Sequence, residues 1–547
     1  MAAPKPPAPS SRVVLAFFIA TIIGGLVFAI WWVTGRSAPS QPEMPGLQGR
    51  PGSHTESADS NQVPRGGVLR GPADPGNAAD TIALLTQATL VRVNRSTDQI
   101  EPWLAESWTS GNNNLTYIIK LRPNILWSDG SAFTAADVAA SLAGVRLLDK
   151  PLTVRAVSPL EVELTLPGSF GPALRLLDRV PIVSAHGGLG PFIMAAGLEP
   201  TPALRTLVRN PHYWRTAPDG KALPYLDRIE LDAAADPAAN LKRLLEGDLD
   251  FIETELRPED YTALKRADQE DRVRLYNLGP SLAADVLWLN RTAGPKATPV
   301  LEGRSGLLNN DDFRLAISTA VDRRQFCDAV YLGACDPVFG PVTPGNPAWF
   351  LSDLAGAGPD PVLARAMLAG IGLHDRNGDG VLDDGAGRAV RMVLLVARGR
   401  PSAARGASFL RDQLKNVGIA VEVTALDEGV LADRRKKGAY DAILDRREPA
   451  DTDPALDMGF WIKPDAATDW EKRINEMMLK QATAIDRVER VQLFADAQKL
   501  RAQHMPEIFL GAPYTYVATS LRVRNVKPSG RHPALLWNAD QLAIASR

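Results

Sequence analysis

The strongest constraint on how this chain can fold lies in residues 102–148, where a strand pattern runs directly into a helix pattern. Asn112–Asn114 follow a glycine and predict a turn. Apolar and polar residues then nearly alternate over Leu115–Leu121, which is typical of a half-buried strand. Thr134 and Asp137 have the spacing of a capping box in its acidic form, ahead of apolar residues at helical spacing. We therefore expect a hairpin followed by a capped helix.

Further along the chain, helix and strand patterns alternate. Apolar residues at helical spacing predict helices over Phe313–Arg323 and Arg487–His504. Another helix is expected to end near Gly418 and to lead into a strand, and Glu507–Tyr516 is also strand-like. Near alternation within residues 157–164 predicts one more strand. This alternation of helices and strands indicates an α/β fold.

Several of these stretches resemble a known protein family. The block LAESW…LTYIIKLRPNILWSDGSAFTAADVAASL resembles one found in extracytoplasmic solute-binding proteins of family 5, the peptide- and nickel-type receptors of ABC importers. NPHYW at 210–214 and LPYLD at 223–227 are similar to the same family, and the resemblance extends over about residues 66–542. It implies the large periplasmic-binding-protein fold, with two lobes joined by a hinge and a discontinuous first lobe. It also implies that the protein binds a solute and is not an enzyme.

The N-terminal region, residues 1–36, contains an uncharged apolar run of 21 residues, Val13–Val33. A membrane-spanning helix needs about 20 residues, whereas the apolar core of a cleaved signal has about 7–15. We therefore predict an uncleaved signal anchor, with a cleaved secretory signal as the alternative. Lys5 and Arg12 precede the run, which favours a cytoplasmic N-terminus and places the remainder outside the cytoplasmic membrane, in the periplasm. Residues 37–65, rich in Pro, Gly and Ser, predict a flexible linker.

The resemblance also suggests how the rest of the chain is divided. Lobe I would comprise residues 66–275 and be completed by a C-terminal return at 506–547, and lobe II would comprise residues 276–505. Ligand contacts to both lobes would drive closure about the hinge.

Composition and motifs argue against other classes of function. The net charge is −2, with 61 basic and 63 acidic residues, so nothing indicates a nucleic acid as partner. Six histidines and two cysteines leave little for a metal cluster. The sequence contains no G-x-S-x-G elbow, no H-E-x-x-H and no Gly-rich loop ending in Gly-Lys-Ser/Thr. We expect no catalytic residue, no resident metal and no cofactor.

Two local features leave alternatives open. Asp375–Asp383 fits the first nine positions of an EF-type calcium loop, but Ala386 replaces the bidentate glutamate of the twelfth. We predict no tight calcium site there, and a plain turn or a weak calcium site remain the alternatives. Cys327 and Cys335 both lie in the expected external part, where disulfides persist, so a disulfide and two buried thiols are both possible.

The resemblance also suggests which residues contact the ligand. Residues 445–454, DRREPADTDP, occupy the place where peptide-binding relatives read like W-x-x-D-x-x-D-P, and Arg447 stands where the tryptophan is expected. The acids of this loop could bind a peptide ammonium, and its arginines a carboxylate through a bidentate contact. The rigid loop around Pro341–Pro344 lines the cleft in relatives. The ligand-binding candidates are Asp451, Asp453, Arg446, Arg447, Thr343 and Trp349.

The expected function is therefore the substrate-binding component of an ABC importer that takes short peptides from between its lobes. Its partners would be the solute, the permease and ATPase subunits, and the membrane that holds the anchor. If Arg446 and Arg447 instead neutralise Asp451 and Asp453, an acidic ligand is the alternative. A nickel chelate, a sugar, an opine, or a role as a membrane-tethered sensor or scaffold are further alternatives.

Overall fold

The structure is a computed structural model that describes residues 63–73, 78–195, 204–233, 237–254, 258–291, 305–354 and 358–546. All of them belong to one compact unit, Glu56–Arg547. The expected anchor and almost all of the expected linker lie outside the described residues. Within the described ranges, no helix is both long and apolar enough to cross a membrane.

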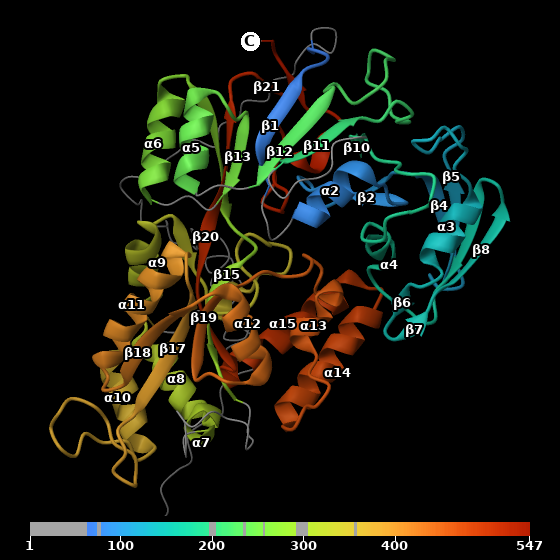
Figure 1. Cartoon of the computed structure of the whole chain (residues 1–547). Helices are drawn as coiled ribbons and strands as arrows, with labels where there is room; N and C mark the ends of the chain where they lie inside the picture. Colours follow the sequence, from blue (N-terminus) through green and yellow to red (C-terminus); the bar gives the residue numbers. More distant parts are fainter. Residues whose placement is uncertain are drawn as a thin grey trace, which may run out of the picture. The chain divides into compact units, whose positions relative to one another are not determined.

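A four-stranded sheet holds the first described strand beside strands from much later in the sequence (Figure 1). Its order is β1-β12-β11-β10, in which β1 pairs with β12 in parallel and the other neighbours are antiparallel. The C-terminal residues Leu535 and Leu542 are buried against it. The strands are β1 (Val68–Ala73), β10 (Phe192–Met194), β11 (Leu204–Arg209) and β12 (Arg228–Ala233).

A second four-stranded sheet, β4-β5-β9-β8, contains the strands of residues 102–148. The expected hairpin and capped helix are confirmed, and the carboxylate of Asp137 accepts a hydrogen bond of 2.8 Å from the backbone N–H of Thr134. The expectation of a single strand within 157–164 was wrong. Val157 lies near the end of one strand and Leu160 in the turn to the next, and both are exposed, because the apolar pattern crosses that turn. The elements are β4 (Ala105–Gly111), β5 (Thr116–Leu121), α3 (Ala135–Leu142), β8 (Thr153–Ser158) and β9 (Glu161–Thr165).

The largest sheet has the order β13-β20-β15-β19-β17-β18, and β14 and β16 also pair with β20. Its strands are β13 (Phe251–Thr254), β14 (Val273–Pro280), β15 (Ala284–Leu289), β16 (Cys335–Pro337), β17 (Arg391–Ala397), β18 (Ala420–Leu426), β19 (Ala442–Arg447) and β20 (Glu507–Ser520). Successive side chains of β17 are buried on opposite faces: Leu394 joins the main core that includes Leu410, and Leu395 packs with Leu431. Burial on both faces is typical of the parallel part of an α/β sheet.

Helices cover both faces of this sheet (Figure 1). α11 (Pro401–Lys415) supplies Leu410, and α12 (Glu428–Lys437) supplies Leu431. The predicted helix Arg487–His504 is confirmed as α15. The helix expected over Phe313–Arg323 is α8, which begins after the capping residue Asn310 but ends at Ala320, because Asp322 caps the next helix. The helices not yet bounded are α2 (Ala78–Thr86), α4 (Ala173–Leu176), α5 (Pro237–Glu246), α6 (Pro258–Gln269), α7 (Ser305–Asn309), α8 (Asp311–Ala320), α9 (Arg323–Tyr331), α10 (Pro361–Gly370), α13 (Met458–Trp461), α14 (Asp469–Thr483) and α15 (Arg487–His504). The α/β fold class is thus confirmed.

Strand β20 passes through two different parts of the structure. Its residues 507–511 pair with β15, and Ile508 and Leu510 are buried in the same core as Leu394. Its residues 514–520 pair instead with β14 and β13, and Val517 is buried in the core of the first sheet. One continuous strand therefore connects the two cores.

The structure bears on the two features for which the sequence left alternatives open, the cysteine pair and the acidic loop. Cys327, in α9, and Cys335, which begins β16, are joined by a disulfide. In the acidic loop, the carboxylate of Asp375 accepts hydrogen bonds from the backbone N–H groups of Gly378 and Gly380, at 2.8 and 2.9 Å. These contacts are typical of a plain turn. Among the described residues, no group of three or more His, Cys, Asp or Glu is arranged to hold a metal, and weak calcium affinity stays untested.

Candidate functional site

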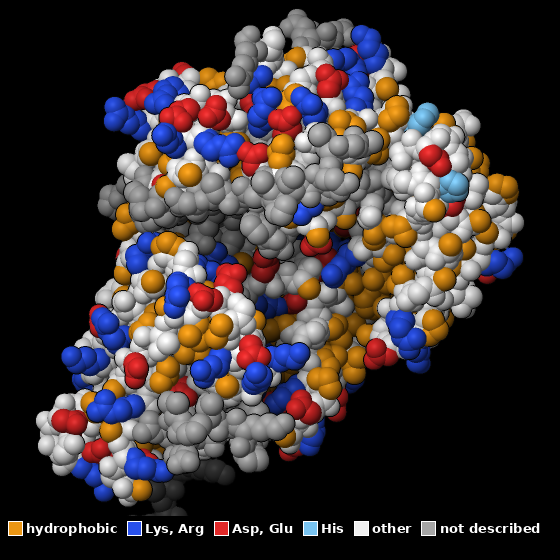
Figure 2. All heavy atoms as spheres, in the orientation of Figure 1, with side chains coloured by type: hydrophobic (Ala, Val, Ile, Leu, Met, Phe, Trp, Pro, Cys, Tyr) orange, Lys and Arg blue, Asp and Glu red, His pale blue; other side chains and the backbone are white. Residues whose placement is uncertain are grey.

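A cavity of about 660 Å³ lies where several segments of the chain meet. Its walls come from α2, from the hairpin β2 (Val91–Val93) and β3 (Ile100–Pro102), from the residues after α4, from loop 448–452 and from residues 531–540. The volume is within the range of about 300–1,000 Å³ that is typical of small-molecule sites. The face drawn in Figure 2 is hollowed, with acidic and basic side chains visible in the hollow.

Local turn chemistry positions the first wall. The carboxamide of Asn94 accepts hydrogen bonds from the backbone N–H groups of Ser96 and Thr97, at 3.0 and 3.2 Å, which fixes the turn between β2 and β3. This turn presents Arg95, which lines the cavity, and Asp98, which contacts arginines beside it. The sequence therefore places charged side chains here through a short turn, with no recognisable motif.

One group of charges beside the cavity is internally paired. The guanidinium of Arg175 contacts Asp451 at 2.7 Å and Asp98 at 2.9 Å, and it also donates to the hydroxyl of Thr452. Arg531 donates to Asp98 and to the same hydroxyl. Burial alone would lower the pKa of Arg175, but the charges of Asp451 and Asp98 outweigh it and raise that pKa. Asp451 is therefore already neutralised within the protein.

Two other charged groups in the wall are half-buried and have no ion-pair partner among the described residues, whereas Asp80, Arg179 and Glu448, which also have none, are exposed. The carboxylate of Asp178 accepts a hydrogen bond of 2.9 Å from the backbone N–H of Val93, and burial raises the pKa of Asp178. Arg95 donates to the backbone carbonyls of His532 and Pro533, and burial lowers its pKa to about 10. Both shifts have the sign expected of a charge that has lost water without gaining a full counter-charge.

An aromatic wall completes the cavity. The guanidinium of Arg92 lies 3.8 Å from the ring centroid of Trp103, and that of Arg215 lies 4.6 Å from it. Asp540 pairs with Arg215 and accepts a hydrogen bond of 3.2 Å from the hydroxyl of Tyr213. These two cation–π contacts hold the Trp103 ring in place at the cavity.

Comparison with known proteins identifies the family. Residues 99–469 match the model of bacterial extracellular solute-binding proteins, family 5. The chain belongs to this family. Family 5 proteins are solute-binding proteins, in agreement with the interpretation of residues 102–148.

Individual relatives are similar at a distance. A "Probable ABC transporter-binding protein" of Deinococcus radiodurans is 24% identical over 63% of this chain, and the match covers 64% of that protein, a little under two thirds. The "Probable D,D-dipeptide-binding periplasmic protein DdpA" of Escherichia coli K12 is 26% identical over 76% of this chain and 79% of its own length.

Two solved structures share the fold of this family 5 chain. The oligopeptide-binding protein AppA of Bacillus subtilis, in complex with a nonapeptide, has a TM-score of 0.69 at 20% identity, over 89% of this chain and 100% of that one. NikA of Brucella suis, in complex with Fe(III)-EDTA, has a TM-score of 0.73 at 18% identity, over 88% and 100%. These similarities confirm the fold expected from the sequence.

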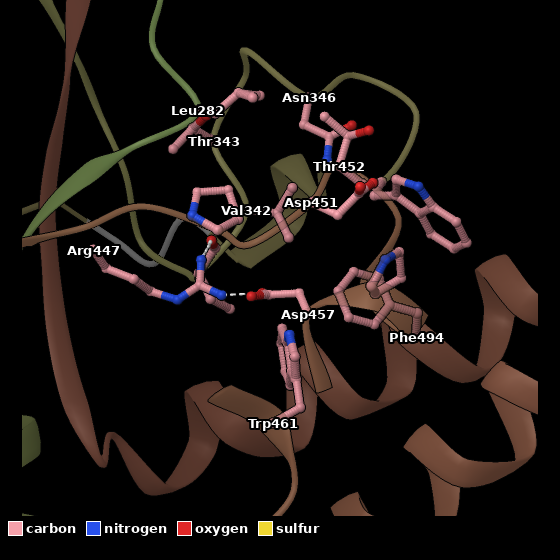
Figure 3. A pocket seen from close by; sticks show the side chains of 14 residues that line it. Leu282, Val342, Thr343, Asn346, Arg447, Asp451, Thr452, Asp457, Trp461 and Phe494 are labelled. Atoms are coloured by element: carbon pink, nitrogen blue, oxygen red, sulfur yellow. Dashed lines mark hydrogen bonds and ion pairs between the residues drawn. The ribbon is translucent and has the colours of Figure 1, made fainter. Parts of the chain in front are cut away.

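Four of the six sequence-predicted residues lie together in this family 5 protein. Thr343, Trp349, Arg447 and Asp451 line a second, small cavity of about 20 Å³ beside the large one, with which it shares Asp451 and Thr452 (Figure 3). This volume has room for about one water molecule. The cavity of about 660 Å³, which Asp451 also lines, has the greater volume of the two.

The charged candidates all have partners inside the protein. Figure 3 shows Arg447 paired with Asp457. Arg446 contacts Asp285 at 3.2 Å. The expected alternative, in which these arginines neutralise Asp451 and Asp453, was therefore wrong.

The other candidates are also engaged. Asp453 contacts Arg490 at 2.5 Å. The hydroxyl of Thr343 donates to the carbonyl of Ser281 at 2.6 Å, and the guanidinium of Arg487 stacks at 3.7 Å from the Trp349 ring. Whether any of the six residues binds solute stays a prediction.

Sequence reasoning missed Arg95, Asp178 and Arg531. Arg95 lies in a turn of ordinary composition, and Asp178 lies just after the four-residue helix α4. A charged residue in such a place is usually on a solvated surface, so no local pattern separates these residues from others. The three come together only because the C-terminal segment returns beside the β2–β3 hairpin.

Proposed function

We propose that this family 5 protein is the substrate-binding component of an ABC importer and that it binds short peptides in the 660 Å³ cavity. The observation that carries the proposal is that Asp178 and Arg95, two opposite charges without ion-pair partners among the described residues, line the same cavity. A desolvated charge without a partner is costly, and a zwitterion supplies both missing counter-charges. The D,D-dipeptide-binding and oligopeptide-binding relatives support this solute class.

The two-lobe division remains part of the proposal, with lobe I at 66–275 and 506–547 and lobe II at 276–505. Several contacts join these ranges: Arg175 pairs with Asp451, the backbone N–H of Gly171 donates to the carbonyl of Ala482 at 2.8 Å, and Arg179 donates to the carbonyl of Leu456 at 2.9 Å. Such contacts support a closed arrangement that a solute would stabilise further.

Permease and ATPase subunits would receive the solute, and the protein would act in the periplasm, held at the membrane by Val13–Val33. Cell fractionation with N-terminal sequencing of the mature protein tests the attachment. A soluble product that begins after Ser37 would contradict it.

A thermal-shift screen of the purified protein tests the solute class. The panel comprises pooled di- to pentapeptides, oligosaccharides and nickel chelates. A ligand of the native state at about 100 times its Kd adds about 2.7 kcal/mol to the free energy of unfolding, enough to raise the melting temperature measurably. We expect the peptide pools to raise it. If only oligosaccharides or nickel chelates do so, the peptide assignment is wrong.

A further inference from the structure

Strand β20 passes from one core to the other over residues 511–514, and a second segment crosses beside it (Figure 1). The turn between β14 and β15 connects the same two regions, because β14 pairs with residues 514–520 and β15 with residues 507–511. The backbone N–H of Ser281, in that turn, donates to the carbonyl of Pro513 at 2.8 Å. In a two-lobed fold, a hinge motion is absorbed by a few residues in such crossing segments.

The crossing part of β20 is paired on both of its edges. β15 pairs with Gly511 on one edge, and β16 pairs with residues 511–513 on the other. The backbone N–H of Tyr514 also donates to the carbonyl of Ala334, just before β16, at 2.9 Å. Because β16 has only three residues, its pairing would open readily unless another contact held it in place.

The Cys327–Cys335 disulfide supplies such a contact, because it ties the first residue of β16 to helix α9. Both cysteines are buried, with exposed fractions of 0% and 1%. Gly511 packs directly against the two sulfur atoms: a Cβ added to it would lie 2.4 Å from the Sγ of Cys335 and 2.9 Å from the Sγ of Cys327. The crossing strand therefore rests on the disulfide, and a glycine leaves room for this close approach.

Two side chains add to the restraint of the crossing segments. Arg323, the buried first residue of α9, donates from Nε to the carbonyl of Phe509 in β20 at 2.7 Å. Helix α9 is thus connected to β20 by a hydrogen bond at its start and by the disulfide further along. On the second crossing segment, the buried hydroxyl of Thr343 donates to the carbonyl of Ser281 at 2.6 Å.

We propose that the Cys327–Cys335 disulfide is a clasp on the hinge, which ties the crossing residues of β20 to α9 so that the lobes move about a fixed point. Because both cysteines are buried, the clasp is a permanent restraint and not a switch operated by a thiol in solution. Without it, β16 would separate from β20 more often, and the lobes would separate more often as well. This inference concerns the hinge alone, so it does not depend on the identity of the solute.

Hydrogen–deuterium exchange of the full-length protein, measured by mass spectrometry, tests the clasp without a ligand. We compare the native protein with the double variant Cys327→Ala/Cys335→Ala, in which the amide of Tyr514 should exchange roughly tenfold faster. The amide of Gly171, which donates to the carbonyl of Ala482, reports separation of the lobes and should also exchange faster. The amides of β17, which pairs with β18 and β19 in the same sheet, are the internal reference and should not change.

A second variant, Gly511→Ala, tests whether the strand rests on the sulfur atoms. Its added Cβ is crowded by both sulfurs in the native protein but not where both cysteines are alanine. We therefore expect it to accelerate exchange at Tyr514 in the native protein and to add little in the double variant, since the two changes affect one contact. Gly168→Ala, whose added Cβ has nothing within 4 Å, is the matched control and should leave exchange unchanged.

The outcomes distinguish a hinge clasp from a general stabilising bond. Faster exchange at Tyr514 and Gly171 with β17 unchanged supports the clasp. Equal acceleration in β17, or no acceleration at Tyr514, overturns it, and acceleration at Tyr514 without any at Gly171 refutes the role in lobe movement. If the double variant does not fold, Gly511→Ala decides by the same exchange pattern. If neither variant folds, the disulfide supports the whole unit and the local role is refuted.

Discussion

Glu471 gives the sharpest stability prediction, because one carboxylate joins three parts of the structure. Its side chain is 4% exposed and contacts Lys463 at 2.8 Å and Arg291 at 3.1 Å. It also accepts backbone N–H groups from Ala467 and Thr468, each at 3.1 Å, which completes a capping box at the start of α14. Removing its charge should therefore weaken α14 and its connection to β15.

The magnitude follows from the pKa of Glu471. Burial alone would raise this pKa, but the ammonium of Lys463 and the hydrogen bonds at Thr468 outweigh burial and lower it from 4.5 to about 2. At 1.36 kcal/mol per unit, this shift corresponds to about 3 kcal/mol of stabilisation. Because the pKa is lower in the folded state, the stabilisation is fully present above pH 4.5 and is lost as the pH falls toward 2.

Urea denaturation of the native protein and Glu471→Gln at a series of pH values tests this reasoning. The difference in the free energy of unfolding should be about 3 kcal/mol at pH 7 and should shrink below about pH 4.5. Taking the difference between the two proteins removes the contributions of other acidic groups. A difference under about 1 kcal/mol at pH 7, or one that stays constant down to pH 2.5, would refute the ion-pair account.

Three further predictions concern individual positions. Asp178→Asn should stabilise the ligand-free protein at pH 7, because burial raises the pKa of Asp178 and its charged form therefore costs stability; a lower melting temperature would contradict this. Arg490→Met leaves Asp453 buried without its partner and should cost about 3–5 kcal/mol in urea denaturation, whereas a loss under 1 kcal/mol would show that the pair contributes little. Gly190→Ala should lower the melting temperature, because the added Cβ would lie 2.5 Å from backbone atoms at the end of α2; Gly168→Ala, with nothing within 4 Å, is the control and should not change it.

Local elements were predictable where one physical rule decides the structure. The hairpin before Leu121, the helix after Thr134 and helix Arg487–His504 follow from apolar spacing and capping, which act within a few residues. The hairpin 153–165 was mistaken for one strand, because its turn is flanked by apolar residues that continue the alternation.

The candidate site was less accessible to sequence reasoning. The loop after β19 was identified, and Asp451 does line the large cavity. The ion-pair partners of the loop's aspartates were not identified, since Arg175, which pairs with Asp451, and Arg490, which pairs with Asp453, come from other segments of the sequence. Which charges pair depends on the tertiary arrangement of the backbone segments. Local sequence patterns carry no information about that arrangement, so the ion-pair partners could not be predicted from them.

The continuity of β20 has a consequence for genetics and protein engineering. Because residues 507–511 complete one sheet region and residues 514–520 another, a break near residue 512 would leave each fragment with half of a strand. β15 would keep its neighbour, residues 507–511, on the N-terminal fragment, whereas β13 and β14 on the same fragment would lose theirs, and the C-terminal fragment would carry residues 514–520 without partners. Unpaired strand edges of this kind associate with other chains. Genes that encoded the two halves separately would therefore yield fragments that aggregate unless they were produced together. Recombination between relatives should be tolerated in the surface loops but not inside this strand.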